Sequence, residues 1–336
     1  MFRFENLDAR IAGAPMAGGT STPQLTAAVS NAGGLGFYGG AYLSPDQLRD
    51  VVREIRALTD APFGVNLFVP EEIPFDAAAF AAYREQLLPL ARRLGTDLPE
   101  AVPYTDDSFE GKIQVLIDER VPVVSFTFGC ADAATIARLH RADVFVAGTV
   151  TSVAEAMIAH DAGVDGLCAQ GIAAGGHRAT YRILDDDPAI ETRPLTAAVV
   201  EATGLPVIAA GGVRSRDDVV ALLEAGAVAV QVGTLLLRCP EAGTKQAHRD
   251  ALVDPRFSET ATTRAYSGRL ARGLVNDFIE ANTASAPPVY PQVNTLTGAI
   301  RRAGATDPEV INLWAGIGFR AAQAIPAADV VAGLAR

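Results

Sequence analysis

The feature that most constrains this chain is a repeating alternation of short apolar runs with longer amphipathic stretches. Eight apolar runs are predicted as β-strands, and each is followed by a turn and a segment with helical periodicity. The runs are apolar at almost every position, as expected of parallel strands buried on both faces. Such units predict an α/β protein with a closed (β/α)8, or TIM, barrel, and a doubly wound open sheet is the alternative. The predicted strands cover residues 11–17, 35–40, 63–69, 121–129, 144–150, 166–171, 206–212 and 229–237.

The chain is longer than a barrel requires, because it has 336 residues and a barrel needs roughly 250. We expect the barrel in residues 1–69 and 106–252, with a helix at 241–252 as its eighth helix. Residues 70–105 interrupt the alternation with several prolines and are predicted as an insertion after the third strand. Residues 253–336, helical over 307–335, are expected to form a C-terminal helical extension, a lid or small lobe near the active face.

Composition excludes several classes of protein. A net charge of −11 argues against a nucleic-acid partner, because such proteins present a basic face to the phosphates. The cysteines, at 130, 168 and 239, form no C-x-x-C pair, so neither a zinc site nor a disulfide framework is expected. We expect no signal peptide in the opening residues, which lack a basic segment followed by an apolar core. No apolar run of about 18 residues occurs in the sequence, so no membrane partner is expected. We therefore expect a cytoplasmic protein that acts on small molecules.

Glycines lie at or after the ends of three of the predicted strands, at the end of the barrel where active sites gather. Gly175 and Gly176 follow the sixth strand, Gly211 and Gly212 end the seventh, and Gly233 lies in the eighth. Backbone without side chains lets N–H groups converge on an anion, and Gly212 precedes a helix that Ser215 should cap. One pair alone would indicate only a tight turn, but glycines at three strand ends on one face favour a phosphate-bearing ligand.

Polar residues at the same face are candidates for chemistry. His177 follows Gly175 and Gly176 in a loop, where an imidazole can take a proton or hold an anionic substrate. Asn66 and Gln170 lie in apolar strands, so their amides either satisfy the backbone or bind the polar edge of a flat heterocycle. Four other residues carry structural expectations. His248 is expected at the surface with the remaining histidines, Cys168 in the core, and Trp314 and Phe319 in packing of the C-terminal helix.

Ordered motifs along almost the whole chain resemble those of the nitronate monooxygenases, formerly called 2-nitropropane dioxygenases. The first is A-P-M-A-G-G-T-S-T-P-Q-L-T-A-A-V-S-N-A-G-G-L-G at 14–36. It is followed by P-F-G-V-N-L-F-V-P (62–70), Q-G-I-A-A-G-G-H-R (170–178), A-A-G-G-V (209–213), Q-V-G-T (231–234) and R-A-Y-S-G-R-L-A-R-G-L (264–274). The family usually has Glu where this chain has Ala173 and Gly where it has Ala179, so a charge beside the flavin is missing.

The resemblance implies a TIM barrel with noncovalent FMN at its C-terminal face. It implies oxidation of alkyl nitronates, or of nitroalkanes, with O2 to a carbonyl compound and nitrite, with His177 as the catalytic residue. A homodimer is a further expectation. Two alternatives remain open: an FMN-dependent NAD(P)H reductase of a quinone or enoyl thioester, and a catalytically silent flavin-binding protein. The implied cofactor-binding residues are Ala14, Pro15, Met16, Asn66, Gln170, Gly175, Gly176, Gly211, Gly212, Gln231, Val232, Gly233 and Thr234.

Overall fold

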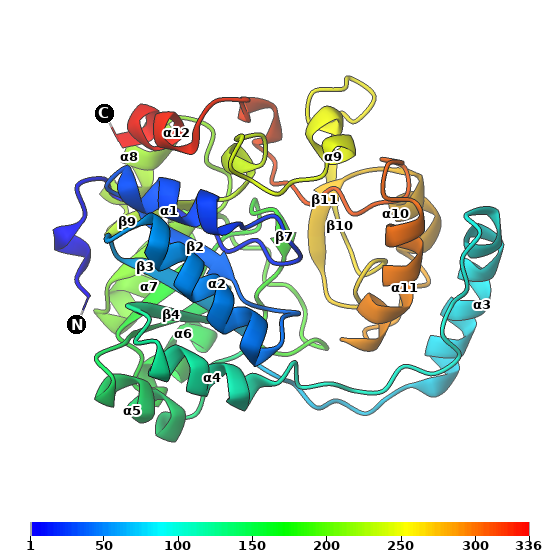
Figure 1. The fold of residues 1–336 in the computed structure, drawn as a ribbon, viewed down its shortest axis with the longest axis horizontal. Helices are drawn as coiled ribbons and strands as arrows, with labels where there is room; N and C mark the ends of the chain where they lie inside the picture. Colours follow the sequence, from blue (N-terminus) through cyan, green and yellow to red (C-terminus); the bar gives the residue numbers. More distant parts are fainter. Residues whose placement is uncertain (1, 336) are drawn as a thin grey trace.

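Eight parallel strands form a closed barrel in the computed structural model, which describes residues 2–335 (Figure 1). Each barrel strand pairs with the next, and the last pairs with the first, where Gln231 lies opposite Ala12. The predicted barrel is confirmed and the open-sheet alternative is wrong. The strands are β1 (Ile11–Gly13), β2 (Leu35–Gly39), β3 (Phe63–Phe68), β4 (Val123–Thr127), β5 (Phe145–Val150), β6 (Gly166–Gln170), β8 (Val207–Ala210) and β9 (Ala229–Val232).

Helices on the outside of the barrel begin at residues that cap them. Ser44 and Gln47 form a capping box at the start of α2, and Ser215 and Asp218 form one at the start of α8. Because these caps define where each helix starts, they also set the length of the loop above each strand. The barrel helices are α1 (Pro23–Asn31), α2 (Pro45–Leu58), α4 (Phe109–Asp118), α5 (Ala133–Arg141), α6 (Val153–Ala162), α7 (Thr192–Thr203) and α8 (Arg216–Glu224).

The barrel interior changes from apolar to polar along its axis. At the N-terminal end of the strands, Phe4 packs edge-on against Phe145, with ring centroids 5.5 Å apart, and both contribute to a buried cluster that includes Cys168. At the opposite end, the inner side chains include Asn66 and Gln170. The apolar end therefore supports the fold, while the polar end is available for a ligand.

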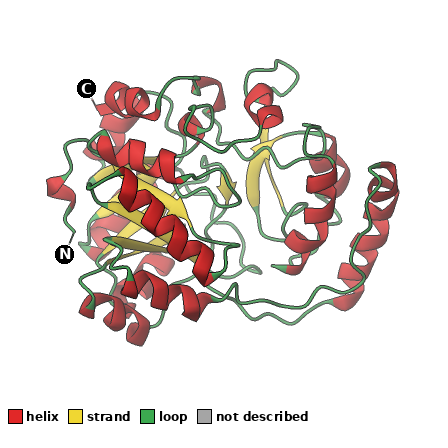
Figure 2. Ribbon diagram, viewed as in Figure 1, coloured by secondary structure: helices red, strands yellow, loops and turns green. Residues whose placement is uncertain are grey.

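A second, smaller lobe lies beside the C-terminal end of the barrel (Figures 1 and 2). Its helices bury a core of their own, in which Phe80 and Tyr83 from the insertion join Leu296 and Ile300 from the C-terminal segment. Two antiparallel strands of this lobe extend a short strand that follows the barrel's sixth strand, with Ala271 opposite His177. The lobe comprises α3 (Ala77–Arg93), β10 (Thr260–Thr263), β11 (Ala271–Leu274), α10 (Asp277–Asn282) and α11 (Gln292–Ala303), with β7 (Gly176–His177) as the added strand.

The last barrel helix is not the one that the sequence predicts. Within 241–252 the structure has only α9 (Gln246–Ala251), whereas α12 (Ala327–Ala335) packs between α1 and α8 and against β1. The predicted helix over 307–335 is also wrong outside α12, apart from one 3-10 turn at Phe319–Ala321. Helical periodicity cannot show which later segment returns to the barrel. Within residues 2–335, no helix combines the length and apolarity needed to cross a bilayer.

Candidate active site

A cavity of about 430 Å³ lies at the C-terminal ends of the barrel strands, beneath the second lobe. Its volume is in the range of small-molecule and cofactor sites. Every residue predicted for the site lines it, although those residues come from separate parts of the sequence. They are Ala14, Pro15, Met16, Asn66, Gln170, Gly175, Gly176, His177, Gly211, Gly212, Gln231, Val232, Gly233 and Thr234.

Asn66 forms part of a polar layer at the bottom of the cavity. Its side chain is almost fully buried, and Nδ2 donates to Ser125 Oγ at 2.9 Å and to Thr127 Oγ1 at 3.0 Å. Its Oδ1 accepts only a long hydrogen bond, from Thr127 Oγ1 at 3.4 Å. The neighbouring strand therefore fixes the amide, and its carbonyl oxygen retains capacity to accept a hydrogen bond.

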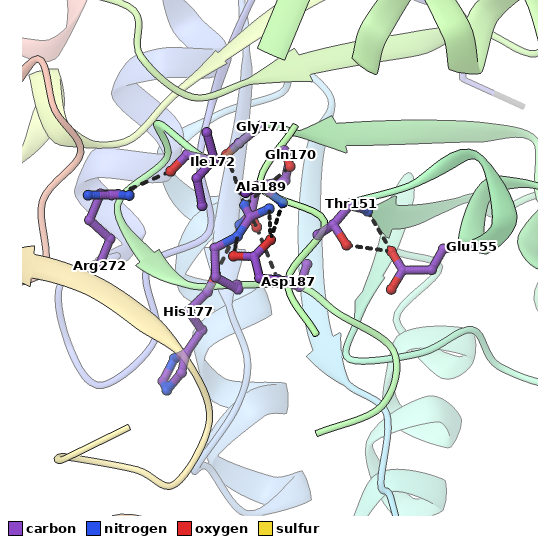
Figure 3. Close-up of polar contacts among 11 residues, drawn as sticks. Thr151, Glu155, Gln170, Gly171, Ile172, His177, Asp187, Ala189 and Arg272 are labelled. Atoms are coloured by element: carbon purple, nitrogen blue, oxygen red, sulfur yellow. Dashed lines mark hydrogen bonds and ion pairs between the residues drawn. The ribbon is translucent and has the colours of Figure 1, made fainter. Parts of the chain in front are cut away.

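Gln170 connects the barrel to β7 rather than standing free in the cavity. Its Nε2 donates to the carbonyl oxygen of His177 at 3.0 Å, and its Oε1 accepts from Arg178 Nη1 at 2.7 Å and from Ala179 N at 3.0 Å. Figure 3 shows Gln170 and Asp187 within one cluster of polar contacts, with the ring of His177 pointing away from it. Gln170 thus holds the backbone of the histidine in place, and one Nε2 hydrogen remains for another acceptor.

The Arg178 guanidinium is the buried centre of this network. Its side chain is 1% exposed and pairs with Asp187 through two contacts, Nε to Oδ2 at 2.8 Å and Nη2 to Oδ1 at 3.1 Å (Figure 3). Arg178 also holds the pKa of the Asp187 carboxyl below its usual range, against a burial effect that raises it. Sequence analysis missed this pair, because nothing local to Asp187 indicates which cation it meets. The pair fixes the segment that follows β7, the short strand in which His177 lies.

His177 lies in an aromatic wall and is held by one polar partner. Its ring centroid is 5.5 Å from that of Phe128 and 5.7 Å from that of Trp314, and Nε2 lies 2.8 Å from Ser267 Oγ. Burial, and then the positive charges of Arg269 and Arg301, lower the pKa of His177 to about 3. The imidazole is therefore neutral at physiological pH. The expectation that a cationic His177 holds an anion does not fit this environment.

The predicted glycines form a cradle of free backbone amides. The N–H groups of Gly175, Gly212 and Gly233 make no hydrogen bond to any residue within 2–335. A side chain at Gly175 would lie 2.4 Å from the backbone of Ala315, so the close approach of these loops requires glycine. Gly212 has a φ of +77° and leads into α8. Unpaired amides next to a helix N-terminus match the requirements of a phosphate group, which is the fit expected for FMN.

Segments that follow the last barrel strand contribute residues that sequence analysis assigned elsewhere or missed. Trp314 was expected to pack within a C-terminal helix, but it lies in an extended segment and lines the cavity. His248 was expected at the surface, but it is 7% exposed and its Nε2 has no partner among residues 2–335. Arg301, on α11, also lines the cavity. No local pattern marks these residues, because the packing of the lobe decides which faces meet the barrel.

Comparisons with known proteins agree on one family. The family model described as "Nitronate monooxygenase" matches residues 7–336. A protein of Staphylococcus aureus called "Probable nitronate monooxygenase" is 37% identical over 321 residues, which cover 94% of this chain and 90% of that protein. The structure of a nitroalkane oxidase from Streptomyces ansochromogenes has 42% identity and a TM-score of 0.95, covering 98% of this chain and 96% of its own. The structure of FabK from Thermotoga maritima has 27% identity and a TM-score of 0.75, covering 98% of this chain and 93% of its own.

Proposed function

Because this chain belongs to the nitronate monooxygenase family, and is therefore an oxidoreductase, we propose that it is an FMN-dependent enzyme that oxidises alkyl nitronates with O2. The products are a carbonyl compound and nitrite, and the atoms balance when two nitronate anions and one O2 give two of each. The observation that carries the proposal is the arrangement within one cavity. A neutral, aromatic-walled His177 lies in the same cavity as the free amides of Gly175, Gly212 and Gly233.

We assign the cofactor's polar groups to particular residues of the cradle. In the proposed complex, the amides of the three glycine loops, together with Thr234, hold the phosphate of FMN. Asn66 and Gln170 offer a carbonyl oxygen and an N–H to the polar edge of the flavin or to its ribityl chain. FMN, when bound, would supply the redox chemistry. The remaining cofactor residues would contact the flavin from the first and last barrel strands, and they are Ala14, Pro15, Met16, Gln231 and Val232.

The state of His177 bears on which substrate the site can use. A general base works best when its pKa is near the operating pH, and burial has lowered the pKa of His177 to about 3. Such a base is poorly suited to removing the α-proton of a neutral nitroalkane. A nitronate has already lost that proton, so the neutral imidazole needs only to orient it through a hydrogen bond. This favours nitronates as the substrate class.

Replacing His177 tests its role directly. We expect His177→Asn to lower nitronate turnover by about 10²- to 10⁴-fold, the usual contribution of such a group, while FMN stays bound. The measurement is nitrite release at saturating O2, together with the visible flavin spectrum of each variant. His160→Asn is the control, because the side chain of His160 is 41% exposed on α6 and does not line the cavity.

Other results would contradict the proposal. An unchanged rate in His177→Asn would remove the histidine from the chemistry. Rapid anaerobic bleaching of the flavin by NADH or NADPH, with no nitrite formed from nitronates, would favour a reductase. Flavin absorbance without turnover of either kind would favour a flavin-binding protein without catalytic activity.

A further inference from the structure

The proposed substrate carries a negative charge, and the cavity must supply a positive one. We propose that the Arg301 guanidinium binds the two oxygen atoms of the nitronate and makes the site selective for the anion over the neutral nitroalkane. This inference rests on the proposed function and names the residue that distinguishes between the two substrate forms. His177 Nε2 is already in contact with Ser267 Oγ at 2.8 Å, and burial lowers the pKa of His177, so the positive charge would come from another group in the cavity wall.

The hydrogen bonds of Arg301 leave part of its guanidinium free. Its Nη2 donates to the carbonyl oxygen of Asn294 at 2.7 Å and to Asn294 Oδ1 at 2.8 Å. Its Nε is buried without a partner, and its Nη1 makes no hydrogen bond with residues 2–335. Asn294 therefore fixes the orientation of the group while other donors remain free. A planar fork of donors matches the two coplanar oxygens of a nitronate.

No carboxylate neutralises this charge. Among residues 2–335, Arg301 is in no ion pair, and none of the titratable groups that interact with it is a carboxylate. These groups are Tyr42, His177, Lys245, Tyr266, Tyr290 and Arg302. Burial lowers the pKa of the Arg301 guanidinium, which reflects the cost of holding the charge without a partner. Holding a half-buried cation without a counter-ion is costly, and a bound anion would relieve that cost.

The other cation close to His177 is not available for this task. Arg269 pairs through Nη2 with Glu71 Oε2 at 2.5 Å, and its guanidinium lies 4.1 Å from the centre of the Phe128 ring. Its charge is thus already compensated. Lys245 and Arg302 also line the cavity and have no ion pair within 2–335, but both residues are exposed to solvent. Arg301 is therefore the half-buried cation in the cavity wall that is free to meet an anion.

Nitrate is a suitable probe, because it is a planar anion of nitrogen and oxygen that the enzyme cannot oxidise. We would titrate nitrate into the FMN-loaded enzyme by calorimetry at constant ionic strength. Arg301→Met should weaken nitrate binding by about 10- to 100-fold, the range of a hydrogen-bonded charge. Arg301→Lys keeps the charge but not the planar fork of donors, so it should weaken nitrate binding less than Arg301→Met does. Arg92→Met is the control. Arg92 is exposed on α3 and does not line the cavity, so this substitution removes one positive charge from the surface only.

A kinetic comparison gives the second readout. In Arg301→Met, kcat/KM for a nitronate should fall by a similar factor while kcat/KM for the matching neutral nitroalkane stays within about twofold. Equal losses for both substrates, or no nitrate binding by the unmodified enzyme, would overturn the assignment. Loss of FMN affinity in Arg301→Met would also overturn it, by placing the guanidinium against the cofactor. The nitrate titration needs no turnover, so it tests Arg301 even if the enzyme fails to oxidise nitronates.

Discussion

At the scale of the residue, the half-buried His177 and the buried His248 differ from what their neighbours in the sequence suggest. His177 lies in the aromatic wall, and His248 is buried in α9 with an unpartnered Nε2. Burial is the main cause in each case, and it lowers the pKa of His177 to about 3 and that of His248 to about 4. Both histidines therefore link the stability of the fold to pH.

The sign of that link follows from the direction of the shifts. In the unfolded chain a histidine takes up a proton near pH 6.5, whereas these two in the folded chain do so only near pH 3 and pH 4. Their contribution to stability is complete above pH 6.5 and is lost progressively as the pH falls toward those values. We expect His177→Asn to reduce the slope of the free energy of unfolding against pH, between pH 6 and 5, by about 1.4 kcal/mol per pH unit. Denaturant titrations at a series of pH values measure this slope. An unchanged slope would show that His177 is already protonated in the folded protein between pH 6 and 5.

At the scale of the element, the insertion is tied to the C-terminal segment by a buried ion pair. Glu71 follows β3, and it accepts from Arg269 Nη2 at 2.5 Å and from the backbone N of Ile183 at 3.0 Å. Arg269 N in turn donates to Ser267 Oγ at 3.3 Å, and Ser267 is the partner of His177. The pair therefore connects the start of the insertion to the residues that hold the histidine.

Removing one partner of this pair should be costly. Glu71→Ala leaves the nearly buried Arg269 without its counter-ion, which typically costs about 3–5 kcal/mol. Glu85→Ala is the matched control on α3, because its carboxylate is 67% exposed in its pair with Arg84 and should contribute less than about 1 kcal/mol. Denaturant unfolding of both variants checks this. If Glu71→Ala and Glu85→Ala lowered the free energy of unfolding equally, the buried pair would stabilise the fold no more than the surface pair.

At the scale of the whole molecule, α12 packs against the first elements of the barrel. After building the second lobe, it returns to place α12 between α1 and α8. Val331 is fully buried there, in the cluster that also contains Ile11 of β1 and Val230 of β9. The outer face of the barrel is thus covered at this point by α12, which begins about a hundred positions after the last barrel strand.

A core truncation in α12 should therefore destabilise the barrel itself. We expect Val331→Ala to lower the free energy of unfolding by about 2 kcal/mol, from lost burial and the resulting cavity. Val253→Ala, at a side chain 49% exposed, should stay within about 0.5 kcal/mol of the unmodified protein. The test is denaturant unfolding followed by far-UV circular dichroism. If the two variants were equally stable, α12 would not be part of the barrel core.

The sequence alone predicted the barrel and the residues at its polar end. Each strand is a short apolar run between turns, and this signal is local. The C-terminal ends of parallel strands necessarily meet at one face, so Asn66, Gln170 and Gly212 could be placed together without a structure. His177 could be singled out because it follows two glycines at that same face.

Only the tertiary structure decided what surrounds those residues. Several features depend on contacts between segments far apart in the chain. They are the pairing of β7 with β11, the burial of His248, the position of Arg301 in the cavity wall and the packing of α12 against the barrel. Periodicity shows that a helix has an apolar face but not which partner covers it. Charge and protonation follow burial, so the neutrality of His177 and the free guanidinium of Arg301 could not be known before the two lobes were seen packed together.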